Sequence, residues 1–256
     1  AHEDAAPVAS SVPAPVSELW GDWTEEQVKK GVWLWINRLV VGLDLCPFAM
    51  ESLPGLRIVI SPTNDRDSSL DLITDEMKLI ATSPLDSPAT TVLTFPMPLF
   101  DKKWFSGKKP HEEYAPAIEE DDEDWESLKW TDNFKEFMRM ATESRDLAQQ
   151  LSACQGQSLT SESLLLTFHP NSTFSEDLND PTDYALRSPF PTLLLLRGVD
   201  VRRAEEVYGE QGQTTEDIAI GNEARLESIG YEQLSMLLEE IFQEARKAKS
   251  GASGAA

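Results

Sequence analysis

Hydrophobic residues near the beginning of the chain repeat with the period of an α-helix. Thr24 and Gln27 form a capping box, in which each side chain can cap a backbone N–H of the first turn. Four apolar residues then follow at i, i+4, i+7 and i+11 and share one helix face: Val28, Val32, Trp35 and Leu39. We therefore predict an amphipathic helix that ends near Gly42.

Other hydrophobic patterns predict the rest of the fold. Helical periodicity predicts five more helices: Asp67–Thr82, Asp132–Ser152, Val201–Tyr208, Thr215–Ile229 and Tyr231–Lys247. Runs of apolar and β-branched residues predict four strands: Arg57–Ile60, Thr90–Phe95, Ser163–Phe168 and Thr192–Leu196. The last two runs do not alternate with polar residues, which is typical of central strands covered on both faces. This order predicts a single α/β (or α+β) domain with a central sheet of about four strands covered by helices.

Three segments lack these patterns. Residues 1–18 are predicted to be an extended leader and residues 247–256 a flexible tail, which leaves residues 19–246 for the domain. Within the domain, about residues 101–127 form an acidic insert, in which lysines precede a dense run of Asp and Glu. Such block charge is typical of a solvated loop. A docking arm is the alternative, because four aromatic residues that could bind a partner flank this run: Trp104, Phe105, Trp125 and Trp130.

The chain is strongly acidic. Its 45 Asp and Glu outnumber its 22 Lys and Arg, which gives a formal net charge of −23. This charge repels nucleic acid and anionic membrane surfaces, so we expect a protein partner with a basic surface, or a charge that serves solubility alone. No apolar run reaches the ~18 residues of a membrane span. The chain begins at Ala1 without an initiator Met, which favours a removed targeting peptide and an organelle over the cytoplasm.

Two residues are candidates for nucleophilic and acid–base chemistry. Cys46 precedes Pro47 and is predicted to lie in a turn; a structural thiol, a nucleophile or redox thiol, and a metal ligand are its alternative roles. His169 follows the predicted strand Ser163–Phe168, at the kind of strand end where α/β sheets bind ligands, or else it bonds loop carbonyls. Because Cys154 is the only other cysteine, we expect no disulfide framework and no metal site.

Arg187 and Asn222 are candidates for ligand binding. Arg187 enters the last strand through a turn with two prolines, where its guanidinium could clamp an anion or pair with an acid of the chain. Asn222 lies on the apolar edge of a predicted helix, so its amide fastens a loop or lines a pocket. The phosphate-binding glycine loops, the nucleophile elbow and the H-E-x-x-H motif do not occur, which disfavours nucleotide-binding, α/β-hydrolase and zinc-protease functions and predicts no cofactor.

Four segments carry a recognisable set of motifs: Val40–Ala49 (VVGLDLCPFA), Phe168–Pro170 (FHP), Arg187–Thr192 (RSPFPT), and Asn222 with Leu226. Together they resemble a widespread bacterial and plastid family that is known only as a domain of unknown function. The resemblance covers about residues 25–240 apart from the acidic insert. It implies no activity, and it favours the plastid stroma as the organelle.

The motifs depart from that family pattern at polar positions. Leu186 replaces the Asn of the family motif N-R-S-P, and Leu194 replaces the His of T-L-H-L-L-R-E. In the motif G-L-N-L-C-P-F-A-K, Asp44 replaces the Asn and Met50 replaces the Lys. The two leucines remove hydrogen-bond partners that a catalytic residue needs for its orientation. A reduced site with added acidic and aromatic residues is typical of a scaffold recruited into an assembly.

Two functions remain open from the sequence. The favoured one is a non-catalytic accessory or interaction subunit of a larger protein complex, which contacts a basic surface of its partner. The alternative is an enzyme or a binder of small anionic ligands, in which Cys46 is the nucleophile, His169 its base and Arg187 the residue that holds the substrate.

Overall fold

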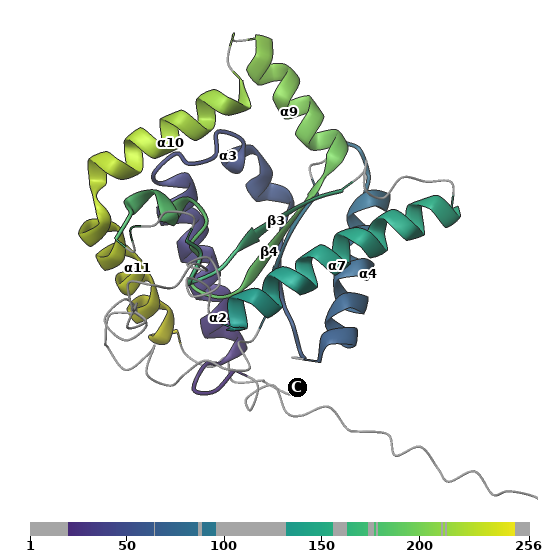
Figure 1. Ribbon diagram of the computed structural model, residues 1–256, viewed down its shortest axis with the longest axis horizontal. Coiled ribbons are helices and arrows are strands. Elements are labelled where there is room, and N and C mark those ends of the chain that lie inside the picture. The colour runs from purple at the N-terminus through teal and green to yellow at the C-terminus, as the bar shows by residue number, and fades with distance from the viewer. Residues whose placement is uncertain are drawn as a thin grey trace, which may run out of the picture.

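The computed structural model describes residues 20–63, 65–86, 89–95, 132–155, 163–173, 177, 179–210, 212 and 214–248. In this part of the chain, helices pack on both faces of a four-stranded sheet (Figure 1). The predicted leader, the acidic insert and nearly all of the predicted tail lie outside the described residues.

The sheet confirms the predicted α/β class and has the strand order β1-β2-β4-β3. Its strands are β1 Leu56–Ile60, β2 Thr90–Thr94, β3 Ser163–Phe168 and β4 Thr192–Arg197. β1 and β2 are parallel, whereas β4 runs antiparallel to both of its neighbours. The observed ends of the strands differ from the predicted ends by no more than one residue.

The long helices follow the predicted order. They are α2 Glu25–Trp35, α4 Arg66–Thr82, α7 Asp132–Gln155, α9 Gly198–Glu210, α10 Thr215–Ile229 and α11 Tyr231–Arg246. The capping box of Thr24 and Gln27 begins α2, as predicted. The sequence did not predict four shorter features: the π-helix η1 Ile36–Val41 that extends α2, the helix α3 Ala49–Ser52, and the 3₁₀ turns η2 Leu53–Gly55 and η3 Pro181–Ala185.

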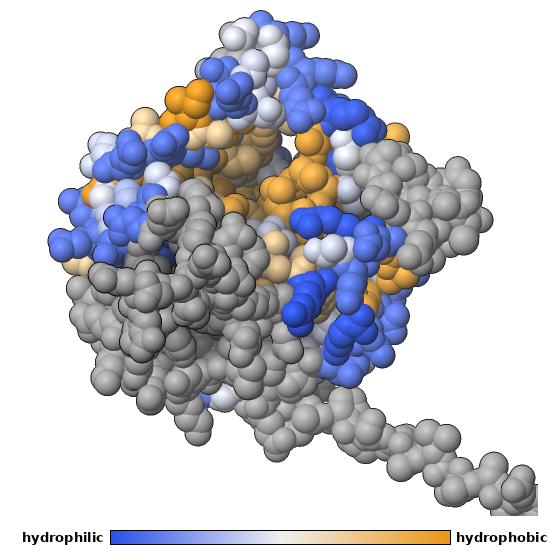
Figure 2. Space-filling view, viewed as in Figure 1, coloured by the Kyte–Doolittle hydropathy of each residue, from blue (hydrophilic) through white to orange (hydrophobic). Residues whose placement is uncertain are grey.

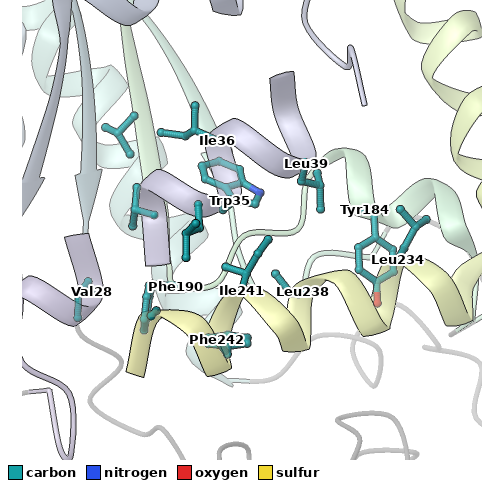
Figure 3. Close-up of a cluster of buried hydrophobic side chains, with 14 of the residues drawn as sticks. Val28, Trp35, Ile36, Leu39, Tyr184, Phe190, Leu234, Leu238, Ile241 and Phe242 are labelled. Atoms are coloured by element: carbon teal, nitrogen blue, oxygen red, sulfur yellow. The ribbon is translucent and has the colours of Figure 1, made fainter. Parts of the chain in front are cut away.

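One hydrophobic core lies between a face of the sheet and helices α2 and α11 (Figure 3). Phe190 is fully enclosed in it, and its ring packs edge-on against Trp23 and Phe242, with ring centroids 5.3 and 5.9 Å away. Helix α2 approaches this ring closely because Gly31 has no side chain; a Cβ there would lie 3.2 Å from Phe190 and 3.4 Å from Ala245. We call this cluster the α2–α11 core.

A second core fills the space between the opposite face of the sheet and helices α4 and α7. The predicted apolar edge of α4 is buried here at Ile73, Met77 and Ile80. Helix α7 contributes Phe134, Phe137 and Ala141, and the sheet contributes Leu93, Leu165, Leu193 and Leu195. We call this cluster the α4–α7 core.

The prediction that Ser163–Phe168 is a central strand is wrong. β3 lies at the edge of the sheet, and β4 is the central strand of the pair. Leu165 packs in the α4–α7 core, but Leu164 and Leu166 point to the other face and remain 41% and 37% exposed. An apolar run without alternation therefore does not prove that both faces of a strand are covered, because the α2–α11 core covers this face of the sheet but leaves Leu164 and Leu166 at its β3 edge exposed.

Candidate functional site

Cys46 lies in a tight turn between η1 and α3. The turn begins at Gly42, where a Cβ would lie 2.4 Å from the carbonyl oxygen of Arg38, and it passes through Asp44, which has a φ of 50°. The thiol is half-buried, and the backbone N–H groups of Phe48 and Ala49 lie near its sulfur. Burial raises the pKa of Cys46, although these two N–H groups oppose the shift. The environment thus favours the neutral thiol over the nucleophilic thiolate.

Asn222 fastens this turn from helix α10. Its Nδ2 donates to the carbonyl oxygen of Leu45 at 2.8 Å, and its Oδ1 accepts from Nη1 of Arg225 at 3.2 Å. Arg225 also donates to the backbone carbonyl and to the carboxylate of Asp44. Two side chains one helical turn apart therefore clamp the segment that holds Cys46, and this is the loop-fastening role weighed for Asn222.

Arg187 is enclosed by groups of the chain itself. Its Nε donates to the carbonyl of Ser172 at 3.1 Å, and its Nη2 forms an ion pair with Asp183, also at 3.1 Å. The guanidinium lies over the rings of Tyr184 and Tyr231, 4.8 and 5.7 Å from their centroids. Asp183 is fully buried and the Arg187 side chain is 13% exposed, so the pair is shielded from water.

His169 is fully buried next to helix α7. Its ring packs against Phe134 and Phe137, with centroids 4.9 and 5.5 Å away, and burial lowers its pKa to about 3. Nδ1 accepts from the backbone N–H of Asn171 at 3.1 Å, so the neutral ring carries its proton on Nε2. Nε2 has no hydrogen-bond partner among the described residues. A neutral imidazole that is already an acceptor at Nδ1 is a poor general base.

The structure brings the candidate residues together in two pairs. His169 and Arg187 lie on interlocked segments, because the His169 N–H donates to the carbonyl of Leu186 and the Arg187 side chain bonds the turn after His169. Asn222 holds the turn of Cys46. Cys46 follows a residue of the α2–α11 core, whereas the His169 ring packs on α7 in the other core. No described contact joins the Cys46 and His169 side chains.

The sequence did not single out two buried charged residues, Asp183 and Arg197. Asp183 carries the ion pair of Arg187, and its N-terminal neighbours Asp180 and Pro181 are the signal for the turn η3 that presents it. Arg197, fully buried at the end of β4, forms an ion pair with Asp200 and donates to the carbonyls of Ser83 and Pro84. Nothing in the local sequence separates Arg197 from a solvent-exposed arginine.

The remaining candidates give no further site in the described part of the chain. Trp104, Phe105, Trp125 and Trp130 lie outside it. Among the residues that are described, no group of three or more His, Cys, Asp or Glu is placed to hold a metal ion. No described helix combines the length and the apolar composition that crossing a membrane requires.

The sheet defines an α/β protein, in which the side chains of Arg187 and Asn222 connect loops that are distant in the sequence. The chain belongs to the family described as "Protein of unknown function (DUF1415)", whose model matches residues 27–106 and 127–236. This confirms the resemblance seen in the sequence, and all four motif segments lie within the matched residues. The gap between the matched segments falls inside the predicted acidic insert. No curated protein and no solved structure matches the chain.

Proposed function

We propose that this protein is a non-catalytic accessory or interaction subunit of a larger protein assembly. The placement of the four candidate residues carries the proposal. Asn222 and Arg187 use their donors on the chain's own backbone carbonyls, and Cys46 and His169 pack in different environments. A catalytic site requires a nucleophile, a base and a binding group that converge on one point. Residues that instead hold loops in place suit a binding scaffold.

The two leucine departures from the family pattern support the same proposal. Leu186 is 39% exposed, and Leu194 is half-buried between the α2–α11 core and the exposed Leu166. Apolar side chains that remain accessible on a highly charged protein are typical of interaction sites. The net charge of −23 favours a partner with a basic surface. An organelle, with the plastid stroma favoured, is the proposed compartment.

The native mass of the untagged protein tests this proposal. A gentle extract from its source would be separated by size exclusion, and co-eluting proteins would be identified by mass spectrometry. We expect elution in a complex several times larger than the 28.6 kDa of the chain. Elution as a 28.6 kDa monomer in fresh extract at low salt would contradict the proposal.

An enzyme or a binder of small anionic ligands is the second candidate. One observation favours it: the buried Nε2 of His169 has no partner among the described residues and could donate to a ligand. The engagement of Arg187 with Asp183 and Ser172 argues against it, because an incoming anion would have to displace an ion pair. A rise in Tm with millimolar phosphate or carboxylates that disappears in Arg187→Met would favour this candidate.

A further inference from the structure

The edge of the sheet at β3 forms an apolar recess beside the α2–α11 core, against which Leu194 packs. Leu164 lies opposite Leu196 and Leu166 opposite Leu194 in the pairing of β3 with β4, so the four side chains share one face. Leu164 and Leu166 are exposed, and the other two are half-buried. Figure 2 shows exposed hydrophobic residues in a hollow over these strands. We use the term apolar recess for Leu164, Leu166, Leu194 and Leu196.

Helix α9 borders the apolar recess. α9 continues directly from β4, and the ring of Tyr208 in α9 packs edge-on against Phe48, at the start of α3, with centroids 5.5 Å apart. α10 follows α9, and Figure 1 shows both helices arching above the exposed end of the sheet. The recess therefore lies at the junction of β3, β4 and α9.

The bordering helices are acidic. α9 and α10 contain three arginines, Arg202, Arg203 and Arg225, and no lysine. Arg225 is engaged with Asp44. The same two helices expose seven carboxylates: Glu205, Glu206, Glu210, Glu216, Asp217, Glu223 and Glu227. The exposed leucines of the apolar recess therefore lie near helices whose exposed carboxylates outnumber their arginines.

We propose that the apolar recess docks a basic amphipathic segment of the partner protein, one that presents apolar side chains between lysines or arginines. This inference rests on the proposed function and names the surface and the partner chemistry. The leucines offer the partner a site to bury apolar side chains, and the carboxylates attract its positive charges and reject acidic sequences. A second copy of this chain is the wrong occupant because two molecules of charge −23 repel each other, and an anionic lipid surface is repelled in the same way.

The test uses a defined peptide as the partner segment. Isothermal titration calorimetry would measure binding of the full chain to a 14-residue peptide of leucine and lysine, with leucine at helical spacing. Two control peptides replace all lysines by glutamate, or all leucines by serine. The variant Leu164→Gln with Leu166→Gln is compared with Leu79→Gln with Leu85→Gln. Leu79 lies on α4 and is 44% exposed, and Leu85 follows α4 and is 62% exposed.

We expect the Lys–Leu peptide to bind with a negative heat-capacity change, which marks burial of apolar surface. The Leu164/Leu166 variant is expected to weaken its Kd about tenfold or more, while the Leu79/Leu85 control leaves it unchanged; a tenfold change corresponds to about 1.4 kcal/mol. The proposal would be overturned if the two variants weakened binding equally. It would also be overturned if the glutamate or the serine peptide bound as tightly as the Lys–Leu peptide. Circular dichroism and Tm establish that both variants are folded.

The native mass of the same variants separates this inference from the proposed function. If wild type and the Leu164/Leu166 variant both remain in the large complex, the proposed function stands and the apolar recess is not the docking site. If the wild type is itself monomeric in its extract, the proposed function fails. Loss of the Leu164/Leu166 variant from the complex, with the Leu79/Leu85 control retained, supports both.

Discussion

The side-chain amide of Asn222 donates a hydrogen bond of 2.8 Å to the backbone carbonyl of Leu45, from a helix 177 positions further along the chain. The carbonyl belongs to the residue before Cys46, so helix α10 determines how the thiol is presented. Arg225 reinforces the contact by bonding Asp44 and Asn222 together. The motif cysteine is thus part of a loop that is held by distant side chains, in keeping with a scaffold.

Replacement of Asn222 by Ala is expected to lower the free energy of unfolding by about 1–2 kcal/mol, because the Leu45 carbonyl loses its donor. Urea unfolding followed by circular dichroism measures this loss. Glu223→Ala, at the adjacent exposed position, is the matched control and is expected to change stability by less than about 0.5 kcal/mol. Equal losses in the two variants would contradict the fastening role.

Replacement of Arg187 by Met is expected to cost about 3–5 kcal/mol, because it leaves the Asp183 carboxylate buried without its cation. The double variant Arg187→Met with Asp183→Asn removes the buried charge as well, and it is expected to be more stable than Arg187→Met. Urea unfolding of Arg187→Met, Asp183→Asn and the double variant gives the coupling between the two residues. Strictly additive losses would show that the ion pair does not stabilise the loop.

Burial of His169 makes stability depend on pH in a defined window. Its pKa is about 3 in the folded protein and about 6.5 when unfolded, so between these values only the unfolded chain takes up the proton. Stability is therefore complete above about pH 6.5 and decreases as the pH falls towards 3, by at most about 1.4 kcal/mol per pH unit from this residue.

The variant His169→Asn, whose amide oxygen can replace Nδ1 as the acceptor for Asn171, isolates this contribution. The difference in unfolding free energy between wild type and variant is expected to shrink as the pH is lowered from 6.5 to 4. Only the wild type loses the contribution that the neutral, buried His169 makes to its stability. A difference that stays constant across this range would contradict a neutral, buried imidazole in the native state.

Cys46 is expected to react more slowly with iodoacetamide at pH 7.5 than a free thiol of ordinary pKa, because burial raises its pKa and reduces the thiolate fraction. Site-resolved mass spectrometry would follow Cys46 with time, and the same chain in urea provides the reference rate for an exposed thiol. Faster reaction in the folded protein than in urea would identify an activated nucleophile and favour the enzyme reading.

The sequence predicted the fold well where local pattern determines structure. The capping box at Thr24 and Gln27, the apolar edge of α4 and the four strands lie where periodicity and β-branched residues placed them. The order of strands did not follow from the pattern. β3 is an edge strand although its sequence resembles that of a buried one, and the exposure of Leu164 and Leu166 depends on how far the helices packed on that face extend.

The geometry of the candidate residues did not follow from the sequence. Asn222 stood out because an amide interrupts an apolar helix edge, and its bond to Leu45 explains that placement. His169 packs on Phe134 and Phe137 of the distant helix α7, and no local pattern encodes that contact. The partners of Arg187 were hidden for a similar reason, because Ser172 reaches it only through the interlocking of two distant loops.

The most direct test of the account is the native mass of the Cys46→Ser variant, expressed at natural level in its source in place of the wild-type protein. The account predicts that this variant elutes in the same large complex as the wild type, because the proposed subunit role does not require a nucleophilic thiol. Elution of both proteins at 28.6 kDa would contradict the account and direct attention to the chemistry of His169 and Arg187.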